Sequence, residues 1–344
     1  MADTKKAKTI SLSRPILLVL IAFVFALGIF LGRSAWLFTS GADDRGESVP
    51  QTALEEFRFI RQSILPEPSP DGRKIKELKP FRYKVNSLIE EKVADGEALS
   101  VAVYFRDLDN GNWFGIHDEQ PFSPESQLKL PLMLAYYKWA EANPLVLRKR
   151  LQVVLPAERE TPTYLRPPKT VAEGKKYSVN ELIFRMIAYG DTDAYAVLAA
   201  NLPPKHQQKI YRDLYVNYDP SKKDDVLSLS AYASFFRVLF NASYLSEEMS
   251  EKALRYLSRN SFRGGMAAGI PPDITLASKA GERFIATGDE GPDVVQLHEF
   301  GLVYHPQRPF LLGITVQGTD YDDIANVLRD ITKLIYNEVD RQSS

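Results

Sequence analysis

The stretch FSPESQLKLPLMLAYYK, residues 122–138, decides the fold. Ser123 suits the cap of a helix and Pro124 its first position, so we expect Ser126 in the first helical turn. Ser126 and Lys129 are three residues apart, which places their side chains on one face of that helix. The positive end of the helix dipole favours negative charge on the serine oxygen, and a buried lysine can act as a base. The stretch therefore supplies a candidate nucleophile and general base.

This spacing alone is a weak signal, because Ser-x-x-Lys arises about once by chance in a chain of this length and composition. A serine near a helix start also usually serves as a cap. Two further stretches add weight: LIFRMIAYGDTDAYAVLAANL (182–202) and LASKAGERF (276–284). In this order the three stretches resemble the motifs of penicillin-recognising serine enzymes, the class A β-lactamases and D,D-peptidases. The resemblance extends from about Glu77 to Glu338.

The resemblance implies an α+β fold, an α/β sandwich of the β-lactamase/transpeptidase type. An antiparallel sheet would be flanked by the terminal helices and joined to an all-helical lobe at about residues 130–262. Sequence periodicity agrees, with a helix over 79–96, two strands around Asp109-Asn110-Gly111 and a closing amphipathic helix over 321–339. Between them we expect helices at 145–155, 179–202 and 230–241, and strands at 274–284, 298–306 and 308–318.

The resemblance also implies roles for individual residues. Ser126 would be acylated, with Lys129 as its general base. The backbone N–H groups of Ser126 and Glu282 would form the oxyanion hole. Lys279 would direct positive charge toward a substrate carboxylate and the proton shuttle, and Gly281 would let substrate approach the strand edge. The alternatives are an exposed strand lysine at 279 and a bulge or turn glycine at 281.

The second and third motifs depart from the family pattern. Gly190 stands in place of the serine that relays a proton to the leaving group, and Thr192 stands in place of an asparagine, while Asp191 is kept. Tyr189 is a candidate replacement for the lost hydroxyl, or else a packed core tyrosine. Ala280 removes a hydroxyl that would bind a substrate carboxylate. We assign Tyr189 and Asp191 to the catalytic group, and Thr192, Ala280 and Gly281 to substrate binding.

The sequence shows no evident group that would activate water to deacylate Ser126. Class A β-lactamases activate water with a glutamate after the second motif, and residues 203–230 contain no such element. Asp219, Asp224 and Asp225 qualify by position only and are expected to be solvated loop acids. For His298 we expect a structural hydrogen-bonding role.

Other site classes find little support. The four histidines show no metal-binding spacing and cysteine is absent, so neither a metal nor an organic cofactor is implied. The net charge of −1 gives no electrostatic argument for nucleic-acid binding.

The N-terminal segments indicate export. We expect a basic cytoplasmic tail (1–14), a single transmembrane anchor (15–38), a polar linker (39–76) and a folded domain (77–344) outside the cytoplasm. The apolar run PILLVLIAFVFALGIFLG carries no charge. A cleaved signal peptide is the alternative, and it exports the chain as well.

These observations predict a membrane-anchored serine hydrolase of the bacterial cell envelope, acting on a cell-wall peptide, a β-lactam or another amide or ester. Efficient β-lactam hydrolysis is not expected. The alternative is a catalytically inactive binding or scaffold module with the same fold. A third possibility is an unrelated exported α/β domain, which adjacency of the Lys279 strand and the Ser126 helix would exclude.

Overall fold

The computed structural model describes residues 59–61, 73–156, 164–219, 222, 226–287 and 292–343. All of them fall within one unit, Arg58–Ser344. The predicted tail and membrane anchor, residues 1–38, lie outside the described residues. Within those residues, no helix combines the length and the apolar character needed to cross a bilayer.

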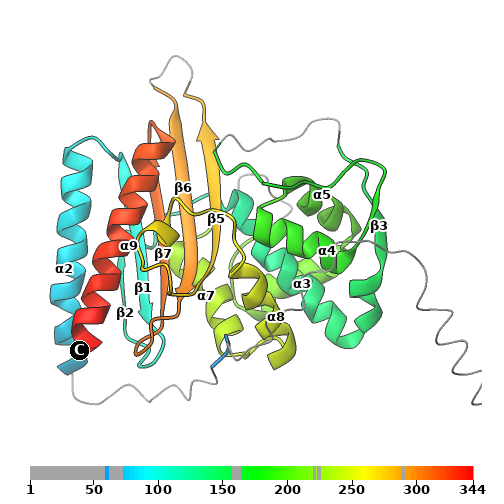
Figure 1. Cartoon of the computed structure of the whole chain (residues 1–344), viewed down its shortest axis with the longest axis horizontal. Helices are drawn as coiled ribbons and strands as arrows, with labels where there is room; N and C mark the ends of the chain where they lie inside the picture. The colour runs from blue at the N-terminus through cyan, green and yellow to red at the C-terminus, as the bar shows by residue number, and fades with distance from the viewer. Residues whose placement is uncertain are drawn as a thin grey trace, which may run out of the picture. The chain divides into compact units, whose positions relative to one another are not determined.

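Strands from both ends of the chain form one antiparallel sheet with the order β2-β1-β7-β6-β5, as predicted (Figure 1). The strands are β1 (Ser100–Asp107), β2 (Trp113–Ile116), β5 (Leu276–Ile285), β6 (Val294–Val303) and β7 (Phe310–Gly318). Residues alternate between the two faces along β1, so Val103 and Phe105 join one hydrophobic cluster while Ala102 and Tyr104 join the other. Because β5 lies at one end of the order, it is an edge strand of this sheet.

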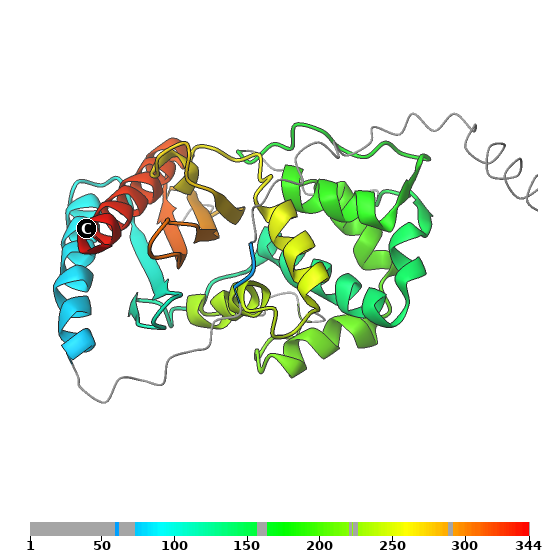
Figure 2. The same cartoon turned by 60° about the horizontal axis from the view of Figure 1, so that its bottom comes forward.

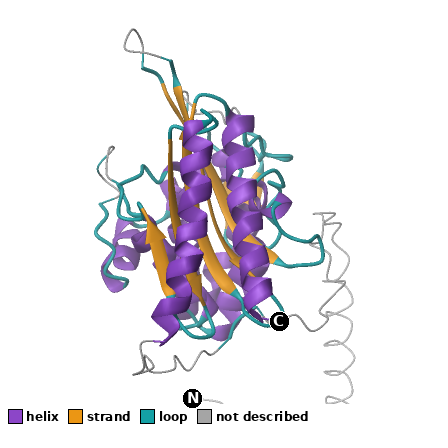
Figure 3. Ribbon diagram, turned by 90° about the vertical axis from the view of Figure 1, so that its left-hand side faces the viewer, coloured by secondary structure: helices purple, strands orange, loops and turns teal. Residues whose placement is uncertain are grey.

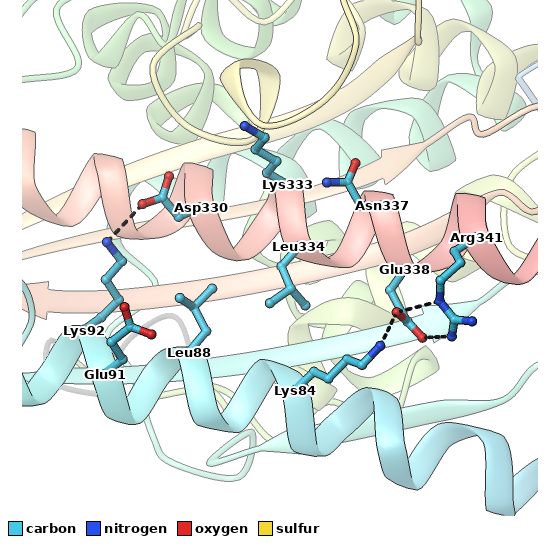
Figure 4. Close-up of a pocket in the computed structure, with 10 residues that line it drawn as sticks. All are labelled: Lys84, Leu88, Glu91, Lys92, Asp330, Lys333, Leu334, Asn337, Glu338 and Arg341. Carbon is cyan, nitrogen blue, oxygen red and sulfur yellow. Dashed lines mark hydrogen bonds and ion pairs between the residues drawn. The ribbon is translucent and has the colours of Figure 1, made fainter.

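The two terminal helices, α2 (Arg73–Ala94) and α9 (Tyr321–Ser343), cover one face of the sheet (Figure 3). The buried side chains of α9 recur three and four residues apart, which is the spacing of one helix face. A groove of about 610 Å³ runs between the helices over Leu88 and Leu334 (Figure 4). Across it, Lys84 Nζ lies 2.8 Å from Glu338 and Lys92 Nζ lies 3.0 Å from Asp330. These ion pairs join the first and last helices of the described domain.

Helices cover the opposite face of the sheet and extend beyond it (Figures 1 and 2). They are α3 (Lys129–Ala142), α4 (Val179–Phe184), α5 (Thr192–Asn201), α6 (Pro204–Asp213), α7 (Leu229–Phe240) and α8 (Glu247–Leu257). α7 contacts β1, β6 and β7 directly, whereas α3 contacts α5, α6 and α8.

Several expected elements differ from the structure. The helix predicted at 145–155 is wrong: a 3₁₀ helix, Pro144–Arg148, is followed by β3 (Arg150–Gln152), which pairs with β4 (Lys176–Ser178). The helix predicted at 179–202 is divided by a π-helical turn at Arg185–Tyr189.

Two further segments contain structure that was not predicted. α6 lies within the stretch treated as a loop, and α8 was not anticipated. Inside the predicted linker, Phe59 and Ile60 are buried in the folded unit. The backbone N–H groups of both residues donate to Glu251 of α8.

Candidate active site

Ser126 lies in a 3₁₀ helix, Glu125–Leu128, which leads directly into α3. The expected α-helical first turn is therefore a tighter 3₁₀ turn, and Pro124 occupies the residue before it. Pro131 is the third residue of α3, where a backbone N–H has no partner within the helix, so the proline removes no hydrogen bond of α3. Ser126 itself is half-buried.

Lys129 is enclosed by three oxygen atoms. Its Nζ lies 2.7 Å from the Gly190 carbonyl oxygen, 3.3 Å from Thr192 Oγ1 and 3.4 Å from Ser126 Oγ. The residue is 2% exposed. Burial lowers the pKa of Lys129 to about 8, and the negative charges of Asp191 and Glu282 oppose this effect only in part. A substantial share of Lys129 is therefore neutral near physiological pH.

Gly190 ends the π-helical turn in the left-handed conformation, with φ 74°. A Cβ built on it would have no atom within 4 Å apart from its two chain neighbours, so among the described residues no side chain from elsewhere fills the place of the expected hydroxyl. A side chain at this backbone conformation would be strained. The turn thus favours glycine at residue 190 and aims its carbonyl oxygen at Lys129.

Asp191 is fully buried and bonds only to backbone. One carboxylate oxygen accepts hydrogen bonds from the N–H groups of Asp193 (3.0 Å) and Ala194 (3.2 Å), and the other accepts from Val171 N–H (2.8 Å). The carboxylate makes no hydrogen bond or ion pair with Ser126 or Lys129. We therefore correct the assignment of Asp191 from a catalytic to a positioning residue, because it caps α5 and so places Thr192 beside Lys129.

Tyr189 does not fill the place of the lost hydroxyl. Its ring packs edge-to-face against Phe184, with ring centroids 5.4 Å apart. Between Tyr189 and Ser126, both of which are described, there is no hydrogen bond. This arrangement corresponds to the packed tyrosine rather than to the proton relay.

Lys279, Ala280 and Gly281 lie on edge strand β5, which packs against the 3₁₀ helix of Ser126. Lys279 is 3% exposed, and its Nζ donates to the Ala280 carbonyl oxygen at 2.5 Å, so the alternative of an exposed lysine is wrong. Burial and the nearby charge of Lys129 hold the pKa of Lys279 well below its usual value. Ala280 is 1% exposed, so its methyl group is not presented at the surface as the substrate-binding assignment requires.

Gly281 is required by a close approach that the sequence did not reveal. A Cβ on it would lie 2.4 Å from His298 Nε2 and 3.3 Å from Ser126 Cβ. Gly281 on β5 and His298 on β6 are directly opposite each other in the sheet. His298 is fully buried, both of its ring nitrogens lack a hydrogen-bond partner among the described residues, and burial lowers its pKa to about 3. The hydrogen-bonding role expected for the His298 ring is therefore not observed.

Gln127 was also missed, and it connects the serine turn to the sheet. Its Nε2 donates to the carbonyl oxygens of Lys279 (3.0 Å) and His298 (3.3 Å). The backbone carbonyl oxygen of Gln127 accepts a hydrogen bond from the Tyr232 hydroxyl at 2.9 Å. Ser126 and β5 are thus held side by side, which excludes an unrelated fold in which they lie apart.

Glu282 connects β5 to the segment that follows residue 163. Its carboxylate accepts hydrogen bonds from the backbone N–H groups of Tyr164 (3.0 Å) and Leu165 (2.6 Å). Of the loop acids, Asp219 is described, and Asp224 and Asp225 lie outside the described residues. Within the described part of the chain, no three His, Asp or Glu side chains are grouped so that they could hold a metal ion.

Comparisons with known proteins agree with this geometry. No curated protein matches the chain. Among solved structures, PBP-A is 19% identical with a TM-score of 0.60, covering 75% of this chain and 96% of that one. A PBP-A variant solved as an acyl-enzyme complex with penicillin G is 18% identical, with the same coverage and TM-score. A β-lactamase from Chitinophaga pinensis is 17% identical with a TM-score of 0.63, covering 74% of this chain and 99% of that one.

At this level of identity the structural matches establish the fold, which is that of the β-lactamase/transpeptidase class. The family itself follows from the sequence profile of the "Beta-lactamase enzyme family", which matches residues 81–339, most of the chain. The chain therefore belongs to the β-lactamase enzyme family, within the penicillin-recognising serine enzymes.

Proposed function

We propose that this domain is a serine acyl-transfer enzyme, in which Ser126 attacks an amide or ester carbonyl and Lys129 removes its proton. The observation that carries the proposal is the enclosed Lys129, with its Nζ 3.4 Å from Ser126 Oγ and its pKa lowered to about 8. Burying a cation without an adjacent carboxylate is costly. This free-energy cost disfavours the protonated form of Lys129, and a general base must be in its neutral form to accept a proton.

The three contacts of Lys129 are compatible with a neutral amine as well as with the protonated form. A neutral amine has two N–H donors and one lone pair, and the carbonyl of Gly190 can only accept. If the second N–H is donated to Thr192 Oγ1, the lone pair faces the Ser126 hydroxyl. Thr192 then orients the base, which refines the substrate-binding role expected for it. After attack, the protonated Lys129 is the candidate donor of the proton that the leaving group needs.

The rest of the site supports slow turnover. Backbone N–H groups of Ser126 and Glu282 remain our proposal for the oxyanion hole, since Gly281 keeps β5 close to the serine. Ala280 offers no hydroxyl to a substrate carboxylate, and no glutamate for deacylation is evident in residues 203–219. A β-lactam should therefore acylate Ser126 and be released slowly.

The substrate and location are inferred from the chain as a whole. The uncharged run at residues 15–32 supports a single-pass anchor with the domain outside the cytoplasm. Cell-wall peptides are the natural amides at that place, and β-lactams are their small-molecule counterparts. PBP-A, which has the same fold, forms an acyl-enzyme with penicillin G in its variant.

A second candidate is a binding module without catalysis. Gly190 and the position of Tyr189 favour it, because among the described residues the Thr192 hydroxyl is the one hydroxyl besides that of Ser126 that is bonded to Lys129, and Tyr189 does not replace the lost proton relay. Such a module would keep the fold and bind cell-wall peptide without forming a covalent bond.

Intact-mass spectrometry distinguishes the two candidates. The full-length chain in detergent is incubated with benzylpenicillin and, separately, with a fluorophosphonate. We expect a stable adduct with each reagent that disappears in Ser126→Ala. The binding module predicts no adduct from either reagent in a folded sample, or an adduct that persists in Ser126→Ala.

A further inference from the structure

Two arginines lie on the sheet face that α7 covers. Arg106 is on β1, and its side chain follows those of Ala102 and Tyr104, which belong to the hydrophobic cluster shared with α7. Arg237 is on α7, which packs across β1 and β7. Both arginines are half-buried.

Neither arginine has an acidic partner among the described residues, and this sets them apart from their neighbours. Arg61 pairs with Asp109 at 3.2 Å, and Arg308 pairs with Asp107 at 2.6 Å. Asp107 follows Arg106 in the chain, so its side chain lies on the opposite face of β1 and does not form an ion pair with Arg106.

The guanidinium of Arg237 is the more unusual of the two. Its Nε is buried and has no hydrogen-bond partner in the described part of the chain. Burial lowers the pKa of Arg237, and the charge of Arg106 lowers it further, so the two cations are near enough to repel each other. A buried donor of this kind is normally satisfied, and two neighbouring cations are normally compensated.

An exposed aromatic surface adjoins the arginines. Trp113 is 51% exposed and stands directly opposite Arg106 on β2. Its ring stacks on Tyr104, with centroids 6.0 Å apart and an interplanar angle of 24°. One patch therefore combines two uncompensated guanidinium groups with an accessible indole.

We propose that Arg106 and Arg237 bind the phosphate group of an organic phosphate, whose carbon-bearing part lies against Trp113. A phosphate monoester carries between one and two negative charges near neutral pH, which suits two uncompensated cations. Guanidinium groups bind phosphate oxygens through paired N–H donors, and an indole face accepts apolar or ring groups. This site is independent of the chemistry proposed at Ser126.

Isothermal titration calorimetry of the full-length chain in detergent tests the site, with inorganic phosphate and phenyl phosphate as probes. We expect Arg106→Gln and Arg237→Gln each to weaken binding of both probes at least tenfold. Trp113→Ala should weaken phenyl phosphate only. Arg329→Gln on α9, which removes the same charge on the other face of the sheet, is the matched control and should bind normally. Equal affinity in the control and the two site variants overturns the proposal, as does an absence of binding heat in the unmodified chain.

Thermal unfolding supplies a second readout that does not depend on one variant. Without phosphate, removing either arginine should leave the melting temperature unchanged or raise it, because the repulsion is relieved. Phosphate should raise the melting temperature of the unmodified chain and of Arg329→Gln but not of the site variants. A phosphate-induced rise of the same size in Arg106→Gln contradicts the site even if Arg237→Gln does not fold.

Vesicles containing phosphatidic acid identify the source of the phosphate. If the lipid competes with phenyl phosphate for the site, the natural ligand includes lipid headgroups. If phenyl phosphate binds and the vesicles do not compete, the site takes soluble organic phosphates.

Discussion

The burial of Lys129 connects the stability of the domain to its chemistry. The amine is held by Gly190 and Thr192 in a place where its protonated form is penalised. The same burial makes the amine a base near neutral pH. A hydrogen-bonded but solvent-exposed lysine at this position would remain a cation and could not activate Ser126.

Gly281→Ala should disturb the serine without replacing any group that reacts. The added methyl group would lie 2.4 Å from His298 Nε2, and the buried ring has little room to move. We expect overpacking to lower the free energy of unfolding by about 1–3 kcal/mol and to slow fluorophosphonate labelling of Ser126. Thermal unfolding and labelling rates measure the two effects. The double variant with His298→Ala should recover both, with His298→Ala alone as the control, and an unperturbed Gly281→Ala would show that the contact is unimportant.

At the scale of single residues, the sequence indicated Ser126, Lys129 and Lys279 through their motifs, and the structure brings these residues together. It could not indicate Gln127 or the close contact of His298 with Gly281, since these depend on the turn before α3 and on strand register. The assignment of Asp191 failed for a related reason. The presence of a carboxylate in a motif does not reveal whether it faces the substrate or the backbone.

Asp191 controls the start of α5, and its replacement separates structural from chemical effects. Asp191→Ala leaves three backbone N–H groups without an acceptor, so we expect a loss of roughly 2–4 kcal/mol in the free energy of unfolding. Asp191→Asn keeps an acceptor oxygen and should lose less.

The same pair of variants tests the electrostatic effect of Asp191. Its negative charge raises the pKa of Lys129, so the neutral Asn variant should shift the pH profile of Ser126 labelling to lower pH. A purely structural role would reduce stability and leave the midpoint of that profile in place.

Secondary structure was predictable where the apolar residues of an element form a clear pattern. The strands β6 and β7 are buried along nearly their whole length, and α9 has one buried face. α6 was missed because only Ile210 and Tyr211 are buried along it, which leaves no apolar stripe to detect. The π-helical turn that Gly190 ends, inside the helix predicted at 179–202, could not be seen in the sequence, because periodicity does not report such a turn.

The short segment at Phe59 and Ile60 belongs to the folded unit and should contribute to its stability. Phe59 is 7% exposed, its ring meets Tyr304 edge-to-face, and the Tyr304 hydroxyl donates to its carbonyl at 2.9 Å. Phe59→Ala should lower the free energy of unfolding by about 3–5 kcal/mol. Chemical denaturation of the full-length chain measures this, with the exposed Arg61→Ala as control. Equal free energies of unfolding for the two variants would mean that packing of Phe59 does not stabilise the domain.

At the scale of the whole molecule, the order of helices and strands and the family resemblance together predicted a sheet built from both ends of the chain, and the structure confirms it. The burial of Phe59 and Ile60 could not be predicted, because two apolar residues in a polar stretch give no periodic signal. The proposed phosphate site was equally hidden, since Arg106 and Arg237 are far apart in sequence and share one sheet face only because α7 packs on β1.

The pH dependence of Ser126 labelling by a fluorophosphonate tests the central claim most directly. The rate constant is measured from about pH 6 to about pH 10 on the full-length chain, with Ser126→Ala as the blank. If neutral Lys129 is the base, the rate rises about tenfold per pH unit at low pH and levels off above the lowered lysine pKa of about 8. In Lys129→Met this rise should disappear together with most of the labelling. A profile that is flat through this range, or one that Lys129→Met leaves unchanged, would contradict the account.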